Sequence, residues 1–539
     1  MKTILVVGGG YAGFYTAWKL EKKLRRDEAE VIVVDPRPYM TYQPFLPEVL
    51  AGSVEARHAA VSLRRHLRRS RLISGTVVKL EHAHRTATVL PTSGAPAFPV
   101  KYDIVVVTAG AVTRKIPIPG VAEQAIGMKH VEEAVAIRDR LLTNFDRAST
   151  LPPGPARRRL LTVTFVGGGF SGVEGFGELL SLASSLARRY PEIDPAELDF
   201  HLVEARDRIL PEVTDGPGRW VVRALERRGG RVHLKAQVTS ARDGRVVLST
   251  GEAFDSDLIV WTVGNGANPM VRSHTDLPID ARGMLVVRAD LRVGTDAEPV
   301  PDAWGAGDDA AVPDLAAPEP GAATVPNAQH AVRQGKLLAS NLVASLRGRP
   351  LKQYKHHSLG TVATLGLGRG IFQFHRVVIK GLPAWLMHRG YHVLAVPSWE
   401  RKVRVLAVWL TAALFGRDIV SLASVQHPRR AFINGGEPEP PAPATPPALT
   451  GADAPSNGVG SGLPGGGASS GSLAAGTSAD GASSGRSNGG GVGPGPSHIG
   501  AAPESLDAGA DAGLLGGGGG GGSESVGGEV VPTGHARSA

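Results

Sequence analysis

Thr3-Ile-Leu-Val-Val-Gly-Gly-Gly-Tyr-Ala-Gly13 opens the chain with a short β-branched run that leads directly into three consecutive glycines. Apolar residues then recur at helical spacing as far as Leu24, and a second apolar run, Val31 to Val34, ends at Asp35. This order predicts a strand, a tight turn, a helix and a second strand, which is the unit that binds dinucleotides.

The glycine spacing Gly8-x-Gly10-x-x-Gly13 gives each glycine a separate task. The first permits the tight turn, the second lets the backbone approach a pyrophosphate, and the third allows the helix to pack closely on the strand. The helix N-terminus then faces the phosphates, and Asp35 can accept hydrogen bonds from a ribose. Glycine loops also occur as plain turns, but the strand, the helix and the terminal acid together favour a nucleotide site.

The same pattern occurs a second time in the middle of the chain. Leu161 to Val166 predicts a strand, Gly167-x-Gly169-x-x-Gly172 the turn, and Val173 to Ala187 a helix. The next strand, Asp199 to Val203, ends at Glu204. Two such units predict two dinucleotides, of which one is a flavin and the other a nicotinamide.

A late glycine turn, Gly305-Ala-Gly-Asp308, assigns FAD to the first unit. Its carboxylate and the helix that follows suit the ribityl and pyrophosphate region of FAD, although an aspartate here is also an ordinary turn residue. In the second unit Glu204 would repel a 2′-phosphate, which favours NADH over NADPH. Arg206 and Arg208 nearby weaken that expectation, because arginines accommodate the phosphate.

Composition divides the chain into a body and a tail. From Gly435 to Ala539 the sequence holds 31 of the 70 glycines and no aromatic residue, so we expect a disordered tail. The tail is acidic, and the overall net charge of +9 therefore corresponds to +16 for residues 1–434, with 57 basic residues against 41 acidic ones. Since the first strand begins at residue 3, we expect no secretory signal peptide and an N-terminus that stays in the cytoplasm.

The chain contains no cysteine. This excludes disulfide frameworks, thiolate metal sites, iron–sulfur clusters and every reaction that needs a redox-active thiol. We assign no metal site from the sequence.

These motifs, in this order, resemble the type II NADH:quinone oxidoreductases, which are flavoproteins with two dinucleotide-binding domains. The resemblance covers residues 1 to about 433. It rests on Val7-Gly-Gly-Gly-Tyr-Ala-Gly13, Tyr42-Gln-Pro-Phe-Leu-Pro47, Thr108-Ala-Gly110, Val166-Gly-Gly-Gly-Phe-Ser-Gly-Val-Glu174 with Gly177-Glu-Leu179, Gly305-Ala-Gly-Asp308 and Ala328-Gln-His-Ala-Val-Arg-Gln334. Thiol-dependent relatives, such as glutathione reductases and sulfide:quinone reductases, are excluded by the missing cysteine.

The resemblance implies an α/β protein with two Rossmann-like domains, the second inserted into the first. Electrons pass from NADH through FAD to a quinone, without proton pumping. The expected boundaries are 1–115 and 286–350 for the FAD-binding domain, 116–285 for the NADH-binding domain, 351–433 for a C-terminal membrane-associating and quinone-site region, and 434–539 for the disordered tail.

The resemblance also implies catalytic roles for Glu174, Gln329 and Gln334. Gln329 would hydrogen-bond a quinone carbonyl beside the flavin, and Glu174 would orient the nicotinamide or handle protons. Acidic and polar residues also favour helix N-termini for ordinary reasons, and we interpret Glu178 as an ordinary helix residue. Arg333 stands where the family often has a glutamine, which leaves the detail of the quinone pocket open. The predicted cofactor-binding residues are Gly8, Gly10, Tyr11, Ala12, Gly13, Asp35, Gln43, Thr108, Ala109, Gly110, Gly167, Gly169, Phe170, Ser171, Gly172, Glu204, Gly264, Gly307, Asp308 and Ala328.

No apolar run reaches the roughly 20 residues that span a bilayer. The longest, Val405 to Phe415, is flanked by basic residues, so from the residues alone it fits a helix in the lipid headgroup region as well as a core or dimer-interface helix. The resemblance favours the membrane and places Trp385, His392, Trp409 and Phe415 at the membrane-associating end.

Three functions remain open at this point. The first is a peripheral NADH:quinone oxidoreductase on the cytoplasmic face of the cell membrane, with the quinone pool and an anionic membrane surface as partners and a possible homodimer. The second is a soluble NADH-dependent reductase of a small iron–sulfur carrier, docked through the basic body. The third, a flavin-bearing regulator of nucleic acid, has no basic and aromatic module to support it, so we expect no nucleic-acid partner.

Overall fold

The computed structural model describes residues 1–113, 116–319, 321–356, 360–426 and 428–433. The predicted disordered tail, 434–539, lies outside the described residues.

The first sheet is built around the N-terminal strand, whose residues Ile4 to Val7 are at most 3% exposed. Because both faces are covered, the strand is apolar throughout rather than alternating. In spatial order the sheet consists of β20 (Arg292–Gly294), β21 (Pro299–Gly305), β8 (Ile104–Val107), β1 (Lys2–Val7), β2 (Ala29–Asp35), β5 (Arg71–Glu81), β6 (Thr86–Pro91) and β7 (Phe98–Lys101). Strands β21, β8, β1, β2 and β5 run parallel, as nucleotide-binding sheets require.

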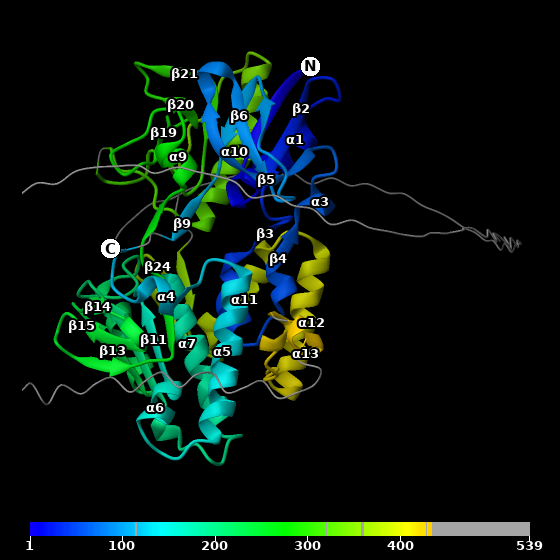
Figure 1. Ribbon diagram of the computed structural model, residues 1–539. Coiled ribbons are helices and arrows are strands. Elements are labelled where there is room, and N and C mark those ends of the chain that lie inside the picture. The colour runs from blue at the N-terminus through cyan, green and yellow to red at the C-terminus, as the bar shows by residue number, and fades with distance from the viewer. Residues whose placement is uncertain (114–115, 320, 357–359, 427, 434–539) are drawn as a thin grey trace, which may run out of the picture. The chain divides into compact units, whose positions relative to one another are not determined.

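Two helices far apart in sequence pack against each other beside this sheet, namely α1 (Tyr11–Lys23) and α10 (Ala328–Leu346). Thr16 donates its hydroxyl to the carbonyl of Gly335 at 3.1 Å. A Cβ on Gly335 would lie 2.4 Å from the carbonyl oxygen of Ala12, so only glycine allows this approach. The close packing brings the N-termini of both helices to the same end of the sheet (Figure 1).

The second sheet is wholly parallel and repeats the first βαβ unit. Its strands, in spatial order, are β10 (Ala125–Gly127), β17 (Leu258–Trp261), β11 (Thr162–Val166), β12 (Asp199–Glu204) and β13 (Gly230–Leu234). Phe165, Phe176 and Phe200 form its buried aromatic core with edge-to-face ring contacts. The helices of this part are α4 (Val121–Gln124), α5 (Val131–Ser149), α6 (Pro155–Leu161), α7 (Phe170–Ala187) and α8 (Asp215–Glu226).

The chain crosses between the sheets twice, through β9 (Ala111–Thr113) and β18 (Asn265–Ala267), which pair antiparallel. After the second crossing, His274 already accepts a hydrogen bond from the backbone of Leu80 in the first sheet. The return to the first sheet therefore occurs before the predicted boundary at residue 285. The α/β class with two dinucleotide-binding sheets, predicted from the sequence, is confirmed.

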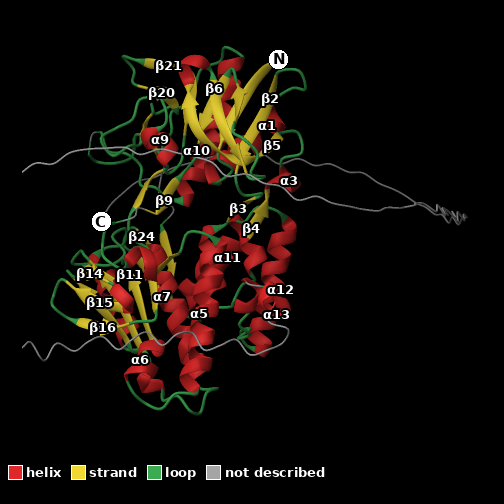
Figure 2. Ribbon diagram, in the orientation of Figure 1, coloured by secondary structure: helices red, strands yellow, loops and turns green. Residues whose placement is uncertain are grey.

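The C-terminal part forms a small antiparallel sheet followed by helices. The sheet contains β23 (Thr361–Thr364), β24 (Gly370–Phe374) and β25 (Val377–Lys380), and the helices are α11 (Leu382–Ala395), α12 (Trp399–Phe415) and α13 (Arg429–Ile433). The chain turns between β24 and β25 at His375, where φ is 50°. Helix α11 packs against the small sheet and against α12 (Figure 2). No helix in the described part of the chain is long and apolar enough to cross a membrane.

Shorter elements complete the described residues. The strands are β3 (Tyr39–Thr41), β4 (Ala60–Ser62), β14 (Val238–Ser240), β15 (Arg245–Leu248), β16 (Ala253–Asp255), β19 (Leu285–Val286) and β22 (Ala310–Ala311). The helices are α2 (Leu46–Leu50), α3 (Leu63–His66) and α9 (Pro269–Ser273).

Candidate active site

Two adjoining cavities lie at the ends of the strands that carry the glycine turns. The smaller, of about 150 Å³, is bordered by the first glycine turn, by the end of β8 and by the turn that follows β21. The predicted residues that line it are Gly8, Gly10, Tyr11, Ala12, Asp35, Gln43, Thr108, Ala109, Gly110, Gly307, Asp308 and Ala328. The structure therefore gathers most residues of the predicted FAD site around one cavity.

The larger cavity, of about 790 Å³, joins the second glycine turn to the start of α10. The predicted residues that line it are Gln43, Gly169, Phe170, Ser171, Gly172, Glu174, Asp308, Ala328 and Gln329. Gln43, Asp308 and Ala328 line both cavities, so the two are neighbours.

Both glycine turns have the shape that a pyrophosphate needs. Gly8 and Gly167 have φ of +96° and +115°, and a Cβ on Gly13 or Gly172 would lie 1.9 Å from the carbonyl oxygen of the first glycine of its turn. At the middle glycines, Gly10 and Gly169, a Cβ would meet nothing within 4 Å. This open backbone at a helix N-terminus fits the phosphates of FAD and NADH.

The acid at the end of each second strand braces its own turn. Asp35 accepts a hydrogen bond from the backbone of Gly9 at 2.7 Å, and Glu204 accepts one from Gly168 at 2.6 Å. Glu204 also accepts the backbone N–H of Arg206, whereas the Arg208 guanidinium donates to Asp215. Arg206 and Arg208 weakened the NADH assignment. The guanidinium of Arg208 is therefore paired with Asp215 and is not directed at a 2′-phosphate.

Gln334 does not reach either cavity. It is 1% exposed, its Oε1 accepts the backbone N–H of Gly307 at 2.9 Å, and its Nε2 donates to Thr324. Gln334 therefore supports the turn that follows β21, at Gly307 with φ of +100°, and its catalytic role stays an expectation from the resemblance.

Asp308 and Lys129, which line both cavities, carry opposite charges that interact at the junction of the cavities. Burial raises the pKa of Asp308, although the Lys129 ammonium opposes the shift. Burial lowers the pKa of Lys129, and the carboxylate of Asp308 opposes this decrease. The neighbouring Asp309 is fully buried, and burial raises its pKa to about 7.

Gln329 lies in the first turn of α10 and lines the larger cavity. Arg333, one turn later, donates a hydrogen bond to its Oε1 at 3.4 Å and also contacts the ring of His356. Arg333, which stands where the family often has a glutamine, therefore orients the side-chain amide of Gln329. Because Oε1 of Gln329 accepts from Arg333, its Nε2 remains as the donor for a ligand.

Glu174 is 8% exposed and receives partners from the C-terminal part of the chain. Its Oε1 accepts the backbone N–H of Thr364 at 3.0 Å and lies 3.2 Å from Nε2 of His388, on α11. Burial alone would lower the pKa of His388, but Glu174, with Glu48 and Glu178, raises it. No local pattern in the sequence indicates a role for this histidine.

Glu178, interpreted from the sequence as an ordinary helix residue, is fully buried. Its Oε1 accepts the hydroxyl of Thr364 at 2.8 Å, and its Oε2 lies 2.9 Å from the guanidinium of Arg417. The interpretation was wrong because only the packing of α7 under the C-terminal helices buries this position.

A third buried glutamate, Glu48 on α2, completes the group. It accepts the indole N–H of Trp409 at 2.7 Å and pairs with Arg389 at 3.1 Å. Arg389 lies between the rings of Trp385 and Trp409, 4.2 and 4.6 Å from their centroids. Burial raises the pKa of Glu48 despite this cation. We call Glu48, Glu174, Glu178, His388, Arg389 and Arg417 the glutamate cluster.

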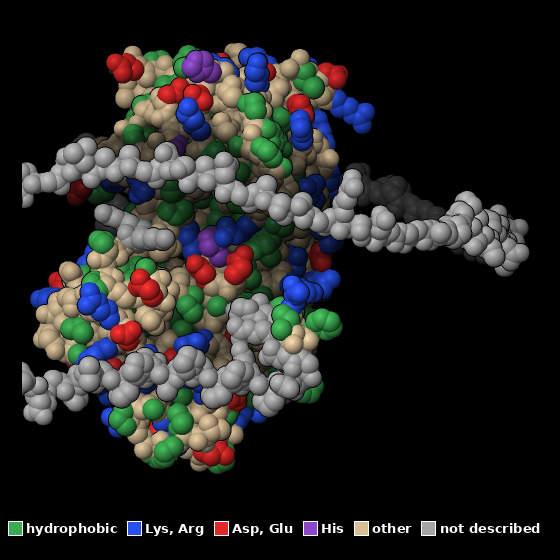
Figure 3. Space-filling model, in the orientation of Figure 1, with side chains coloured by type: hydrophobic (Ala, Val, Ile, Leu, Met, Phe, Trp, Pro, Cys, Tyr) green, Lys and Arg blue, Asp and Glu red, His purple; other side chains and the backbone are tan. Residues whose placement is uncertain are grey.

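Three of the four residues assigned to the membrane-associating end turn inward. Trp385 and Trp409 flank Arg389, and His392 lies 3.2 Å from the hydroxyl of Tyr42 and lines the larger cavity. Phe415 is 83% exposed. The exposed apolar residues of α12 include Val403, Leu406, Leu410 and Leu414. Figure 3 shows hydrophobic and basic side chains next to one another over this part of the molecule.

Residues 2–335 match the model of the pyridine nucleotide-disulphide oxidoreductase family. The chain belongs to this family. Within it, the chain is 27% identical to the type II NADH:quinone oxidoreductase of Haemophilus influenzae over 68% of its own length and 85% of the relative's. It is 30% identical to the internal alternative NAD(P)H-ubiquinone oxidoreductase A1, mitochondrial, of Solanum tuberosum, over 77% and 87%.

Solved structures of this family share the fold. The NDH2 of Plasmodium falciparum in complex with NADH has a TM-score of 0.70 and 16% identity, covering 78% of this chain and 99% of that one. The predicted resemblance to type II NADH:quinone oxidoreductases is confirmed, and with it the assignment of FAD and NADH as cofactors.

Proposed function

We propose that the protein is an FAD-dependent NADH:quinone oxidoreductase that transfers electrons to a membrane quinone without pumping protons. One observation carries the proposal. The larger cavity joins the second glycine turn to Gln329 and adjoins the cavity of the first turn, so that a nicotinamide and a quinone have access to the same flavin. When bound, FAD accepts a hydride from NADH and returns two electrons to an acceptor.

The chain's own residues bind and orient the two nucleotides. The glycine turns receive the pyrophosphates at the N-termini of α1 and α7, and Asp35 and Glu204 bind the riboses. Phe170 and Ser171, at the start of α7, border the space for the nicotinamide. We take residues 1–113 and 268–350 as the FAD-binding part and residues 116–267 as the NADH-binding part.

We infer that Glu174, which lines the larger cavity, and its buried partner His388 hold a proton for the reduction of the quinone. The raised pKa of His388 favours a protonated imidazole, whose Nε2–H faces Oε1 of Glu174. Reduction of a quinone consumes protons, and a general acid must lie within hydrogen-bond reach or one water of its acceptor. We assign Gln329 to the quinone carbonyl through its Nε2.

The outer face of α12 is proposed to bind the cytoplasmic face of the membrane. Its exposed leucines and the adjacent Arg401, Lys402 and Arg404 form an apolar stripe bordered by cations, which suits anionic headgroups. The same apolar face is also available to a second copy of the chain, which would give a homodimer.

The function is tested with full-length, FAD-loaded protein. With NADH, we expect reduction of a quinone in proportion to the NADH consumed, and higher rates with quinone embedded in anionic vesicles than with the same quinone in detergent. A soluble iron–sulfur carrier offered in parallel should be reduced poorly. Efficient reduction of that carrier, with slow quinone reduction, would support the alternative reductase.

A further inference from the structure

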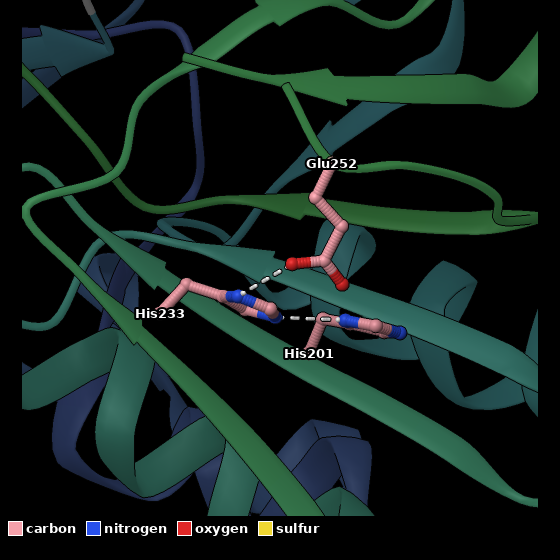
Figure 4. A group of neighbouring side chains, drawn as sticks. All are labelled: His201, His233 and Glu252. Atoms are coloured by element: carbon pink, nitrogen blue, oxygen red, sulfur yellow. Dashed lines mark hydrogen bonds and ion pairs between the residues drawn. The ribbon is translucent and has the colours of Figure 1, made fainter. Parts of the chain in front are cut away.

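Two histidines outside the active site face each other on neighbouring strands of the second sheet. His201 on β12 and His233 on β13 have nearly parallel rings, and Nδ1 of His201 lies 2.9 Å from Nε2 of His233 (Figure 4). Neither residue lines either cavity.

Each imidazole turns its other nitrogen toward a carboxylate. Nε2 of His201 lies 3.1 Å from Oδ1 of Asp199, and Nδ1 of His233 lies 3.4 Å from Oε2 of Glu252. Two imidazole nitrogens that face each other at 2.9 Å can share either one proton or one metal ion.

The two histidines are enclosed by neighbouring side chains on most sides and are open to solvent at Glu252. The ring of Phe254, on β16, stacks on His201 with centroids 3.7 Å apart, and the side chain of His201 is 1% exposed. Glu252, just before β16, is 44% exposed and leaves an entrance from solvent. The two negative charges of Asp199 and Glu252 exceed the single positive charge of Arg231, whose guanidinium contacts Asp199. One ligand atom from each of His201, His233 and Glu252 lies within 4.8 Å of the others.

We propose that His201, His233 and Glu252 bind a transition-metal dication of the zinc class. Two imidazoles and one carboxylate are the ligands of such ions, whereas Ca²⁺ and Mg²⁺ prefer sites made of oxygen. Two nitrogens 2.9 Å apart can both lie about 2.0–2.1 Å from one ion that is placed off the line joining them. Asp199 acts as the outer carboxylate that fixes which nitrogen of His201 faces the metal.

The role of this metal is structural. It ties β12 and β13 to the β15–β16 hairpin, which supplies Glu252, and so closes the small antiparallel sheet onto the parallel one. Strand β12 ends three residues after His201 at Glu204, so the metal also stiffens the strand that carries the proposed ribose ligand.

The test uses full-length, FAD-loaded protein that has been dialysed against a chelator and then freed of it. Zn²⁺ binding is measured by equilibrium dialysis with elemental analysis, and the melting temperature is followed with and without micromolar Zn²⁺. We compare wild type with His233→Gln and Glu252→Gln, and use His84→Gln, an exposed histidine elsewhere, as the matched control. Magnesium at the same concentration controls for charge alone.

We expect wild type and His84→Gln to bind one more Zn²⁺ per chain than either cluster variant. Zn²⁺, but not Mg²⁺, should raise their melting temperature by about 3 °C or more, because an ion that binds only the folded state stabilises it. Equal Zn²⁺ stoichiometry in wild type and Glu252→Gln, or no Zn²⁺-dependent shift in wild type, would overturn the proposal and leave a shared proton between the two imidazoles. Since Glu252 is exposed, its variant keeps the test valid even if His233→Gln folds poorly.

Discussion

At the scale of single residues, we expect Glu204 to determine the preference for NADH over NADPH. Its carboxylate braces the second glycine turn and would meet a 2′-phosphate with like charge. We expect Glu204→Gln to narrow the ratio of kcat/KM for NADH over NADPH by about tenfold, or ~1.4 kcal/mol. Glu226→Gln, an exposed change of the same charge on α8, should leave the ratio unchanged. An unaltered ratio in Glu204→Gln would move the selectivity to Arg206.

Substitution of the two glutamines on α10, Gln329 and Gln334, should impair different steps. Gln329→Ala removes a ligand contact in the larger cavity, so flavin bleaching by NADH in single turnover should stay fast while reoxidation by quinone slows. Gln334→Ala removes the acceptor of the part-buried backbone N–H of Gly307, at a cost of about 1–3 kcal/mol, and should weaken FAD retention instead. Stopped-flow absorbance and FAD release on dilution separate the two. Loss of FAD from Gln329→Ala would contradict these roles.

His388 should make stability depend on pH. Its pKa is raised in the folded protein by Glu174, Glu48 and Glu178, with His392 as the neighbouring imidazole. The stabilisation is therefore complete below the unfolded value of about 6.5 and is lost as pH rises through the higher folded value. We expect the free energy of unfolding of wild type to exceed that of His388→Gln most at pH 6 and least at pH 9. A difference that is constant or grows with pH would refute the assignment.

At the scale of elements, α12 has two faces with different tasks. The inner face carries Trp409, bonded to Glu48, and the outer face exposes Leu406, Leu410 and Leu414. Deleting the whole helix would therefore also uncover a buried glutamate, and a single outward substitution is the cleaner probe of membrane binding.

We expect Leu410→Glu to lower the fraction of protein that sediments with anionic vesicles and to slow reduction of a lipid-soluble quinone. Reduction of ferricyanide, a water-soluble acceptor, should be unchanged, because the outer face supplies no flavin ligand. Leu90→Glu, the same change at an exposed leucine on β6, is the control. If the two variants partition alike, α12 is not the membrane face.

At the scale of the whole molecule, the glutamate cluster joins three parts of the chain. Arg417 follows α12 and pairs with Glu178 on α7, both almost fully buried. Arg417→Ala leaves that carboxylate buried without its cation, which typically costs about 3–5 kcal/mol. We expect a corresponding loss in the free energy of unfolding, measured by denaturant titration, and partial recovery in the double variant Arg417→Ala, Glu178→Gln. Strictly additive effects would show that the pair is not coupled.

Sequence alone determined the features that neighbouring residues control. The two glycine turns, the strands that end at Asp35 and Glu204, and the start of α10 depend on backbone sterics and periodicity within a few residues, and they identified the family and both nucleotides. Tertiary structure decided the rest. Glu174 accepts from Thr364, 190 positions away, and such a contact leaves no local trace because it depends on which elements pack together. For the same reason the burial of Glu178, the holding role of Gln334 and the meeting of His201 with His233 became visible only once helices and sheets had removed those polar groups from water.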